Sequence, residues 1–552
     1  MRFFRNNLFL SAVLAVACAF ATPAVQAQQA QKPVAIVSFT PLEKLLKDST
    51  YILRACNVPE FGGIFNMMAT TYTQGLDPKR PIGVSVTLDG QNPVGLVFVP
   101  VSDRSRFFAA LETMGIEPDD LGDGLFEIDA NGQTIFAKES NGWLFIAQAE
   151  DSLNSLPQNP ATLLGDLPNK YDIAVRLNVQ ALPADLKDMA VQQMRIGLEN
   201  TLNEQGGLSD QEREDAARAS EAQIAQLESF ISDTEQVILG WSIDSVGQKT
   251  FFDAAAQFME GTKFANQANA MKDLKSAYSA FQLPGTSASF RATSTYNDEA
   301  DKEMAKQNLK NSMVQIRKQI DDANTSEDSK ELVRNLAEAL LELTEKTIDE
   351  GTFDGAGSLS VADDTLRVLF GGRIADGRAL EGELKKLVAG LPNSSEKPDV
   401  KFDYETFQGV TLHSIALPVK IADPNARKIF GDELKIWVGT ADKAFMVSMD
   451  PTGDGSLKAA IEAMQAAPNA PATPFEGVIE FTDLLKFAQA VSPNPILDNV
   501  LQTIQEFDGK DKVEVIGSII PRGGIYRLSI DEGVLRAAGT AAKMGSGGGG
   551  GF

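Results

Sequence analysis

Residues 82–101 read IGVSVTLDGQNPVGLVFVPV. Apolar residues recur at alternate positions on both sides of Asp89–Asn92, a segment of residue types that favour turns. This pattern predicts two strands, Ile82–Leu88 and Val94–Pro100, paired in an antiparallel hairpin.

The segments that follow this hairpin extend it into a larger unit. Asp103 precedes a stretch with apolar residues at helical spacing, and this stretch predicts a helix. Further strands are expected around Asn131–Gly132 and Asn141–Gly142, and a short helix near Asp151–Leu156. The pattern therefore predicts a hairpin, a helix and more strands in succession.

The same order of elements recurs later in the chain. A strand at Asp172–Asn178 precedes two helices, of which the second begins at a capping box formed by Ser209 and Glu212. A similar cycle starts again at 287–296 and includes a predicted helical hairpin over 299–321 and 327–348. Strands at 172–178 and 477–483, or at 237–243 and 513–519, lie about 275 to 305 residues apart. This spacing predicts an internal duplication.

Strand hairpins with helices inserted between them are typical of an α+β fold. We expect largely antiparallel sheets with helices packed on one face, and helical hairpins between the strand hairpins. The expected division of the chain is a signal peptide (1–27), a first α+β module (28–275), a strand plus helical hairpin (276–354), a second α+β module (355–543) and a glycine-rich flexible tail (544–552).

The first residues predict export. Arg2 and Arg5 precede an apolar run at Leu8–Ala21, and Val25–Ala27 offers a small-x-small cleavage site. Cleavage before Cys18, as in a lipoprotein, is the weaker alternative. The apolar run is too short to span a membrane and nothing later replaces it, so the sequence predicts a periplasmic or extracellular protein without a transmembrane segment in the mature chain.

Composition excludes some classes of partner. The chain has 75 acidic and 50 basic residues, for a net charge of −25, and no cluster of Lys and Arg that could neutralise a phosphate backbone. Nucleic acid is therefore excluded as a partner.

Once Cys18 is removed with the leader, Cys56 is the only cysteine, so no intramolecular disulfide is expected. Its apolar neighbours predict that Cys56 is buried.

Three stretches carry a resemblance: RPIGVSVTLDG (80–90), GLVFVPVSDRSRFFAAL (95–111) and GWLFIAQAEDSL (142–153). With them, the chain resembles large exported bacterial proteins built of hairpin and helix modules. The resemblance implies an α+β fold. That family brings no established activity, and it implies no catalytic residue.

Residues that do difficult chemistry are scarce. His413 is the only histidine, so histidine dyads, two-histidine metal sites and most triads are excluded. It lies in the alternating run Val410–Leu417, which is typical of a strand residue that faces solvent or a hydrogen-bonding neighbour. No phosphate-binding or dinucleotide-binding glycine loop is present.

One segment resembles a calcium loop. Asp450, Thr452 and Asp454 occupy its first ligand positions, but Ile461 stands where a bidentate carboxylate should close the loop. The alternative is a plain turn in which Ser456 caps the next helix. Calcium at Asp450, Thr452 and Asp454 is the only cofactor that the sequence suggests.

These observations favour an exported, non-catalytic protein with a binding or structural role toward an envelope or extracellular partner. One alternative is an exported hydrolase that uses two paired carboxylates. Another is a carrier of lipid or another apolar ligand, suggested by four phenylalanines close together in the sequence: Phe251, Phe252, Phe258 and Phe264. Packing of these rings in the core would explain them equally without any ligand.

Overall fold

The structure of the chain is a computed structural model, and it describes residues 32–113, 115–130, 133–204, 210–322, 327–361, 365–390, 398–418, 424–507 and 509–546. The predicted signal peptide with its cleavage sites lies outside these residues. So do the predicted cap at Ser209, the turn at Asn131–Gly132 and the last residues of the tail.

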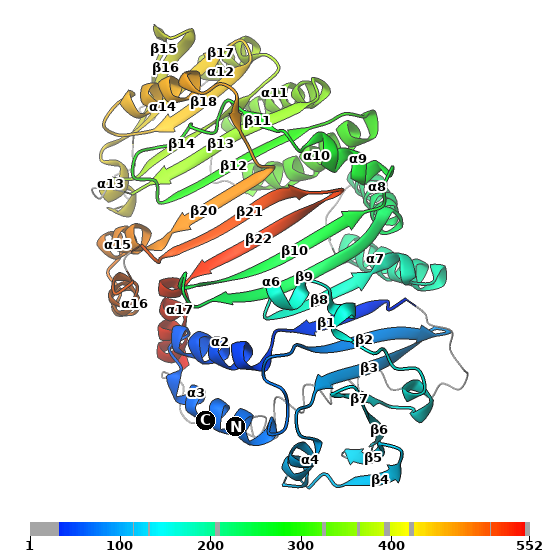
Figure 1. Cartoon of the computed structure of the whole chain (residues 1–552). Coiled ribbons are helices and arrows are strands. Elements are labelled where there is room, and N and C mark those ends of the chain that lie inside the picture. The colour runs from blue at the N-terminus through cyan, green and yellow to red at the C-terminus, as the bar shows by residue number, and fades with distance from the viewer. Residues whose placement is uncertain are drawn as a thin grey trace.

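A single antiparallel sheet of 20 strands contains nearly all the strands of the described chain (Figure 1). Its first half has the spatial order β4-β5-β6-β7-β3-β2-β1-β8-β9-β10. The strands are β1 (Ala35–Phe39), β2 (Ile82–Asp89), β3 (Asn92–Pro100), β4 (Pro118–Gly122), β5 (Leu125–Ala130), β6 (Gln133–Ser140), β7 (Trp143–Ala147), β8 (Ile173–Asn178), β9 (Thr234–Asp244) and β10 (Lys249–Phe258).

The second half has the order β15-β16-β17-β18-β14-β13-β12-β20-β21-β22. Its strands are β12 (Ala288–Thr295), β13 (Thr352–Ser360), β14 (Arg367–Arg373), β15 (Asp399–Phe407), β16 (Val410–Pro418), β17 (Glu433–Ala441), β18 (Ala444–Met449), β20 (Phe475–Glu480), β21 (Lys512–Ile520) and β22 (Gly523–Asp531). A small separate sheet pairs β11 (Lys275–Ser276) with β19 (Ala470–Pro471).

The two halves meet where β10 pairs with β22, and we call this pairing the seam. Each strand of the first half has a counterpart at the same distance from the seam in the second half. These counterparts come in the same order along the chain in both halves. Residues 276–354, which the sequence set apart, contribute β12 and the start of β13 to the second half of the sheet. The predicted α+β class with a large antiparallel sheet is confirmed.

Helices are inserted at mostly corresponding places in the two halves. The first half contains α2 (Leu42–Ala55), α3 (Pro59–Tyr72), α4 (Arg104–Glu112), η1 (Glu150–Leu153), α5 (Ala161–Leu164), α6 (Leu167–Lys170), η2 (Val179–Ala181), α7 (Ala184–Glu204), α8 (Asp210–Asp233) and α9 (Lys263–Ala270). The second contains α10 (Glu299–Asp322), α11 (Glu327–Asp349), α12 (Gly377–Gly390), α13 (Pro424–Phe430), α14 (Gly455–Ala466), α15 (Phe481–Val491), α16 (Pro495–Gln505) and α17 (Glu532–Ser546). Among the described residues, no helix combines the length and apolar character that crossing a membrane requires.

The hairpin predicted from residues 82–101 is confirmed as β2 and β3, with Gly90 at a positive φ of 61° in the turn. Val84, Val86 and Val97 are buried beneath α4 in one core cluster. Leu164 and Leu167, from α5 and α6, belong to a cluster on the other side of the sheet. In the outer part of the first half, both faces of the sheet are therefore covered.

Candidate functional site

The central strands β8, β9, β10, β22, β21, β20 and β12 carry different side chains on their two faces. Val175, Leu239 and Tyr526 lie in one cross-strand row. The neighbouring row on the same face contains Phe252 and Phe290. Because side chains alternate along a strand, residues of such rows share a face.

We call this surface the apolar face. Its members are between 37% and 56% exposed, which is unusual for so many large apolar residues gathered on neighbouring strands. They are Val175, Leu239, Phe252, Phe290, Phe370, Ile479 and Tyr526.

Glycines on neighbouring strands allow two aromatic rings of the apolar face to lie across the sheet. A Cβ atom added to Gly357 would lie 2.5 Å from the ring of Phe290, and one added to Gly517 would lie 2.8 Å from the ring of Tyr526. Phe252 stacks on Trp241 with the ring centroids 5.8 Å apart and the planes 3° apart. The flat faces of these aromatic rings therefore lie over the neighbouring strands.

The opposite face of the same strands carries ion pairs. Arg527 donates two hydrogen bonds of 2.8 Å to the buried carboxylate of Asp253, and Tyr171 donates a third. Arg291 pairs with Glu476 at 2.5 Å. Burial raises the pKa of the Tyr171 hydroxyl, so this group stays protonated and donates. The centre of the sheet is thus amphipathic.

A cavity of about 420 Å³ lies on the apolar face at the end of β9, β10 and β22. Tyr526 and Ile519 line it from the sheet, and Met271 lines it from beside α9. Phe230, Phe258 and Phe264 complete its lining as an aromatic cluster with centroids 5.2 to 5.5 Å apart. Its volume lies within the roughly 300–1,000 Å³ that is typical of small-ligand sites.

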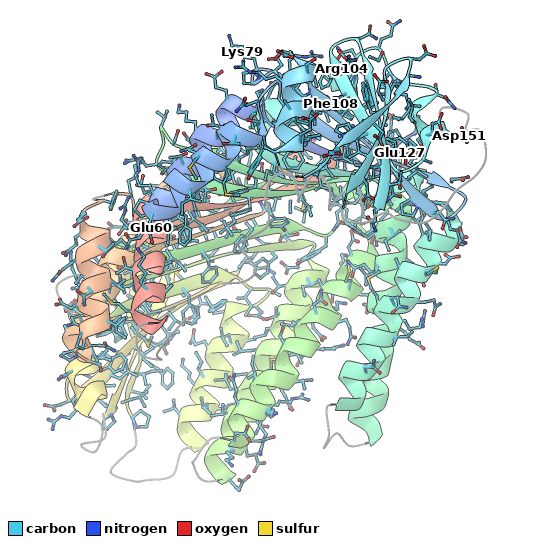
Figure 2. The ribbon with its side chains drawn as sticks, turned by 90° about the horizontal axis from the view of Figure 1, so that it is seen from below. Glu60, Lys79, Arg104, Phe108, Glu127 and Asp151 are labelled. Atoms are coloured by element: carbon cyan, nitrogen blue, oxygen red, sulfur yellow. The ribbon has the colours of Figure 1, made fainter. Side chains whose placement is uncertain are left out.

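Helices stand at both ends of the central strands. Figure 1 shows α7 to α11 at one end and α15, α16 and α17 at the other. Figure 2 shows that these helices project from the same side of the sheet. Leu535 of α17 packs with Trp241, and Phe264 of α9 lines the cavity, so this side is the apolar face. The apolar face is therefore bounded by helices at both ends of its strands.

The structure separates the four phenylalanines that the sequence singled out. Phe252 lies on the apolar face, and Phe258 and Phe264 line its cavity. Phe251 lies on the opposite face, with the guanidinium of Arg527 4.0 Å from its ring centroid. The larger apolar face was missed because its members come from strands far apart in the sequence. Glycines that recur within those strands are the signal that could have indicated it.

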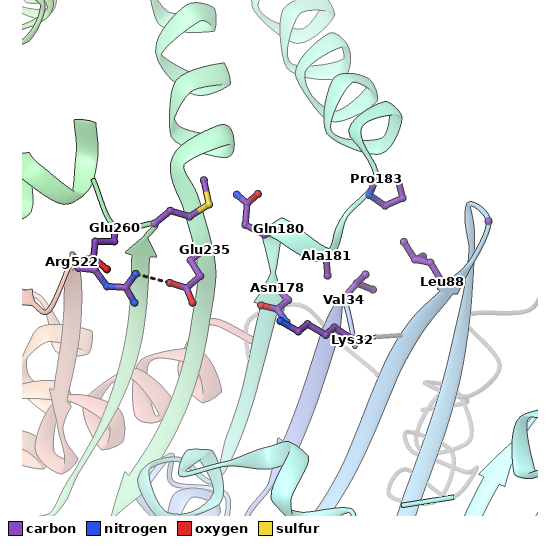
Figure 3. A pocket seen from close by; sticks show the side chains of 12 residues that line it. Lys32, Val34, Leu88, Asn178, Gln180, Ala181, Pro183, Glu235, Glu260 and Arg522 are labelled. Atoms are coloured by element: carbon purple, nitrogen blue, oxygen red, sulfur yellow. Dashed lines mark ion pairs between the residues drawn. The ribbon is translucent and has the colours of Figure 1, made fainter. Parts of the chain in front are cut away.

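A second cavity of about 710 Å³ lies where several strands of the first half end (Figure 3). Its lining mixes charged residues with apolar ones such as Val34 and Leu88. Glu235 and Glu260 both line it, and Glu235 pairs with Arg522 at 2.9 Å. Two carboxylates thus share one cavity, but one of them is already neutralised by an arginine.

The residues of the calcium-like segment have partners within the chain. Asp450 is buried, and its carboxylate accepts hydrogen bonds from the backbone and hydroxyl of Thr452, at 2.9 and 2.6 Å, and from the hydroxyl of Ser456. Asp454 instead contacts Tyr404 at 2.8 Å and Lys458 at 3.0 Å. The structure brings Asp450 and Thr452 together and directs Asp454 to other partners.

A different group could hold a metal by its residue types. Ligand atoms of Glu381, Asp403 and His413 lie within 4.8 Å of one another. However, Lys385 donates hydrogen bonds of 2.7 Å to both carboxylates. The backbone N–H of Asp403 donates to His413 Nδ1 at 3.1 Å. A metal would have to replace these donors, so the geometry favours a neutral, hydrogen-bonded histidine.

Cys56 follows α2 and is partly buried, and this burial raises the pKa of its thiol. A raised pKa disfavours the thiolate, which is the reactive form.

No family model, curated protein or solved structure matches this chain.

Proposed function

We propose that this protein is an exported, non-catalytic binding protein that holds an apolar ligand with long hydrocarbon chains, such as a lipid, on its apolar face. The observation that carries the proposal is the gathering of seven exposed apolar residues on one face of the sheet, six on the central strands and Phe370 on β14, beside an aromatic cavity. Covering such a surface with hydrocarbon is favourable by roughly 25 cal/mol for each Å² removed from water.

The form of the surface favours hydrocarbon chains over a protein partner. Helices border the apolar face at both ends of its strands, which hinders the approach of a second flat sheet (Figure 2). Every central strand is hydrogen-bonded on both sides, so a peptide cannot add as a further strand. A chain of methylene groups needs no hydrogen bonds and fits such a surface.

The location is proposed from the sequence. The charged start of the chain and its apolar run favour export, and the net charge of −25 favours a well-solvated exterior. An envelope or extracellular lipid is the ligand that such a location offers.

Binding of a fluorescent fatty acid, cis-parinaric acid, tests this proposal. The mature wild-type chain should bind the probe, and the double variant Phe252→Glu/Tyr526→Glu should lose at least about 1.4 kcal/mol, or tenfold in affinity, because hydrocarbon would then cover a charge. The control is Leu121→Glu, which places one such charge at a residue 50% exposed on β4, away from the apolar face. Equal affinities for all three proteins would contradict the proposal.

The hydrolase alternative rests on Glu235 and Glu260, which share the larger cavity. It predicts hydrolysis of a polysaccharide that is lost in Glu260→Gln, whereas hydrocarbon binding predicts no such activity. Calcium at Asp450 remains a separate prediction and is not needed for either function.

A further inference from the structure

The two halves of the sheet differ at one pair of equivalent positions, where a helix packs on the sheet. In the first half, Phe108 of α4 packs against Phe126 of β5, with the ring centroids 4.6 Å apart. This pair belongs to an apolar core cluster, as expected for a helix on a sheet.

The same positions in the second half are polar. Asp103 and Asp376 cap α4 and α12, and Phe108 and Glu381 each lie five residues after their capping aspartate. With these caps matched, the strand registers from β3 to β5 and from β14 to β16 place His413 of β16 where Phe126 lies in β5. An acid and a histidine thus replace two phenylalanines.

The polar positions form a connected network. Nδ1 of His413 accepts the backbone N–H of Asp403, so the proton of the neutral ring lies on Nε2, as the hydrogen bonds assign it. Nε2 then donates to the Thr440 hydroxyl at 3.1 Å, and Thr440 donates to Glu381 at 3.0 Å. Lys385 donates hydrogen bonds to both Glu381 and Asp403 and so completes a closed ring of hydrogen bonds.

We propose that this His413 network is a proton-operated contact that fastens α12 to the sheet at neutral pH and loosens it in acid. The groups that face the ring are Glu381 and Lys385 from α12, Asp403 from β15 and the hydroxyl of Thr440 from β17. An apolar pair suffices for this packing in the first half, so the fold itself does not require a histidine here.

Protonation makes the present arrangement unfavourable. The ring is almost fully buried, and a proton added to Nδ1 would face the Asp403 N–H, which is itself a donor. The new N–H can bond instead to Asp403 Oδ1, which lies 3.4 Å from Nδ1. That change moves a residue already at a positive φ of 53° in an irregular part of β15, whose other carboxylate oxygen accepts the hydrogen bond from Lys385 of α12.

The movement would reach the apolar face through α11. Leu380 and Leu384 of α12 pack with Leu340 and Leu343 of α11, whose hairpin with α10 stands at the end of the central strands (Figure 1). Release of a bound hydrocarbon in acid is a consequence that rests on the proposed function. The proton-operated contact itself does not.

Two measurements on the mature chain test the contact without any ligand. Because His413 is the only histidine, its imidazole signal in a proton NMR titration belongs to one residue. The pKa read from this signal should lie below the ordinary value of 6.5. Amide hydrogen exchange of Gly377–Gly390, corrected for intrinsic rates, should rise across that titration by up to about tenfold for each pH unit, the steepest change that one proton can produce.

The first half supplies the control variant. Glu381→Phe/His413→Phe installs its aromatic pair and should abolish the acid-dependent exchange of α12, and His413→Gln gives a second non-titrating variant should the first fail to fold. Exchange in α12 that is independent of pH in the wild type, or equally dependent in the variants, would overturn the proposal. Probe binding at both pH values separates this result from failure of the proposed function.

Discussion

At the scale of the residue, the burial of His413 links stability to pH. Desolvation lowers the pKa of its imidazole below the ordinary 6.5 of the unfolded chain, although Glu381 and Asp403 oppose this shift. Above about pH 6.5 both states are neutral, and below it the unfolded chain binds a proton that the folded chain resists. Stability is therefore present above that pH and is lost as the pH falls through the lowered value.

This difference can be measured by urea unfolding. Between about pH 7 and pH 5, the wild type should lose up to about 1.4 kcal/mol per pH unit more than His413→Gln, which cannot titrate. Parallel losses in the two proteins would show that carboxylates alone set the acid sensitivity.

Asp450 offers a second prediction at this scale. Asp450→Asn should cost about 1–3 kcal/mol of unfolding free energy, because the buried carboxylate accepts bonds from Thr452 and Ser456. Asp454→Asn, at a more exposed site, should cost less than about 1 kcal/mol. The unfolding free energies of both variants, measured with and without calcium, decide the role of Asp450. A loss of stability in Asp450→Asn that is seen only with calcium would instead assign Asp450 as a cation ligand.

At the scale of the element, the sequence predicted most of what is local. The helical hairpin expected over 299–321 and 327–348 is confirmed as α10 and α11, because its apolar spacing and capping residues are contained in the segment itself. Helix α3 was not predicted, since Gly62 and Gly63 interrupt its pattern. The group of Glu381, Asp403 and His413 was also missed, because its members meet only through strand pairing.

The helix caps give a test at this scale that uses both halves. Asp103 accepts the N–H of Arg106 at the start of α4, and Asp376 accepts that of Ala379 at the start of α12. Asp103→Ala and Asp376→Ala should each cost about 1 kcal/mol, measured by denaturant unfolding. A negligible cost at one cap alone would show that the two helices are held differently.

At the scale of the whole molecule, the two halves share one order of strands, with most helices inserted at corresponding places. This correspondence supports the predicted duplication, which remains a prediction. Sequence alone indicated the repeat but not the single sheet, because pairing of β10 with β22 joins strands about 270 residues apart and leaves no local pattern. The amphipathic centre of the molecule follows from that pairing.

The seam predicts how the molecule unfolds. Arg527→Ala would leave the buried Asp253 with Tyr171 as its remaining side-chain donor and should cost about 3 kcal/mol. Weakening the seam should also separate the unfolding of the two halves into two calorimetric transitions. Arg378→Ala, which breaks an exposed pair with Asp442, is the control and should preserve the wild-type profile.

The most direct test of the apolar face is the mass of the mature protein purified from its own host, measured natively and again after denaturation. We predict a native mass larger by that of a lipid, which denaturation releases and which the Phe252→Glu/Tyr526→Glu variant lacks. Identical native and denatured masses for the wild type, together with no uptake of lipid from added vesicles, would contradict hydrocarbon binding.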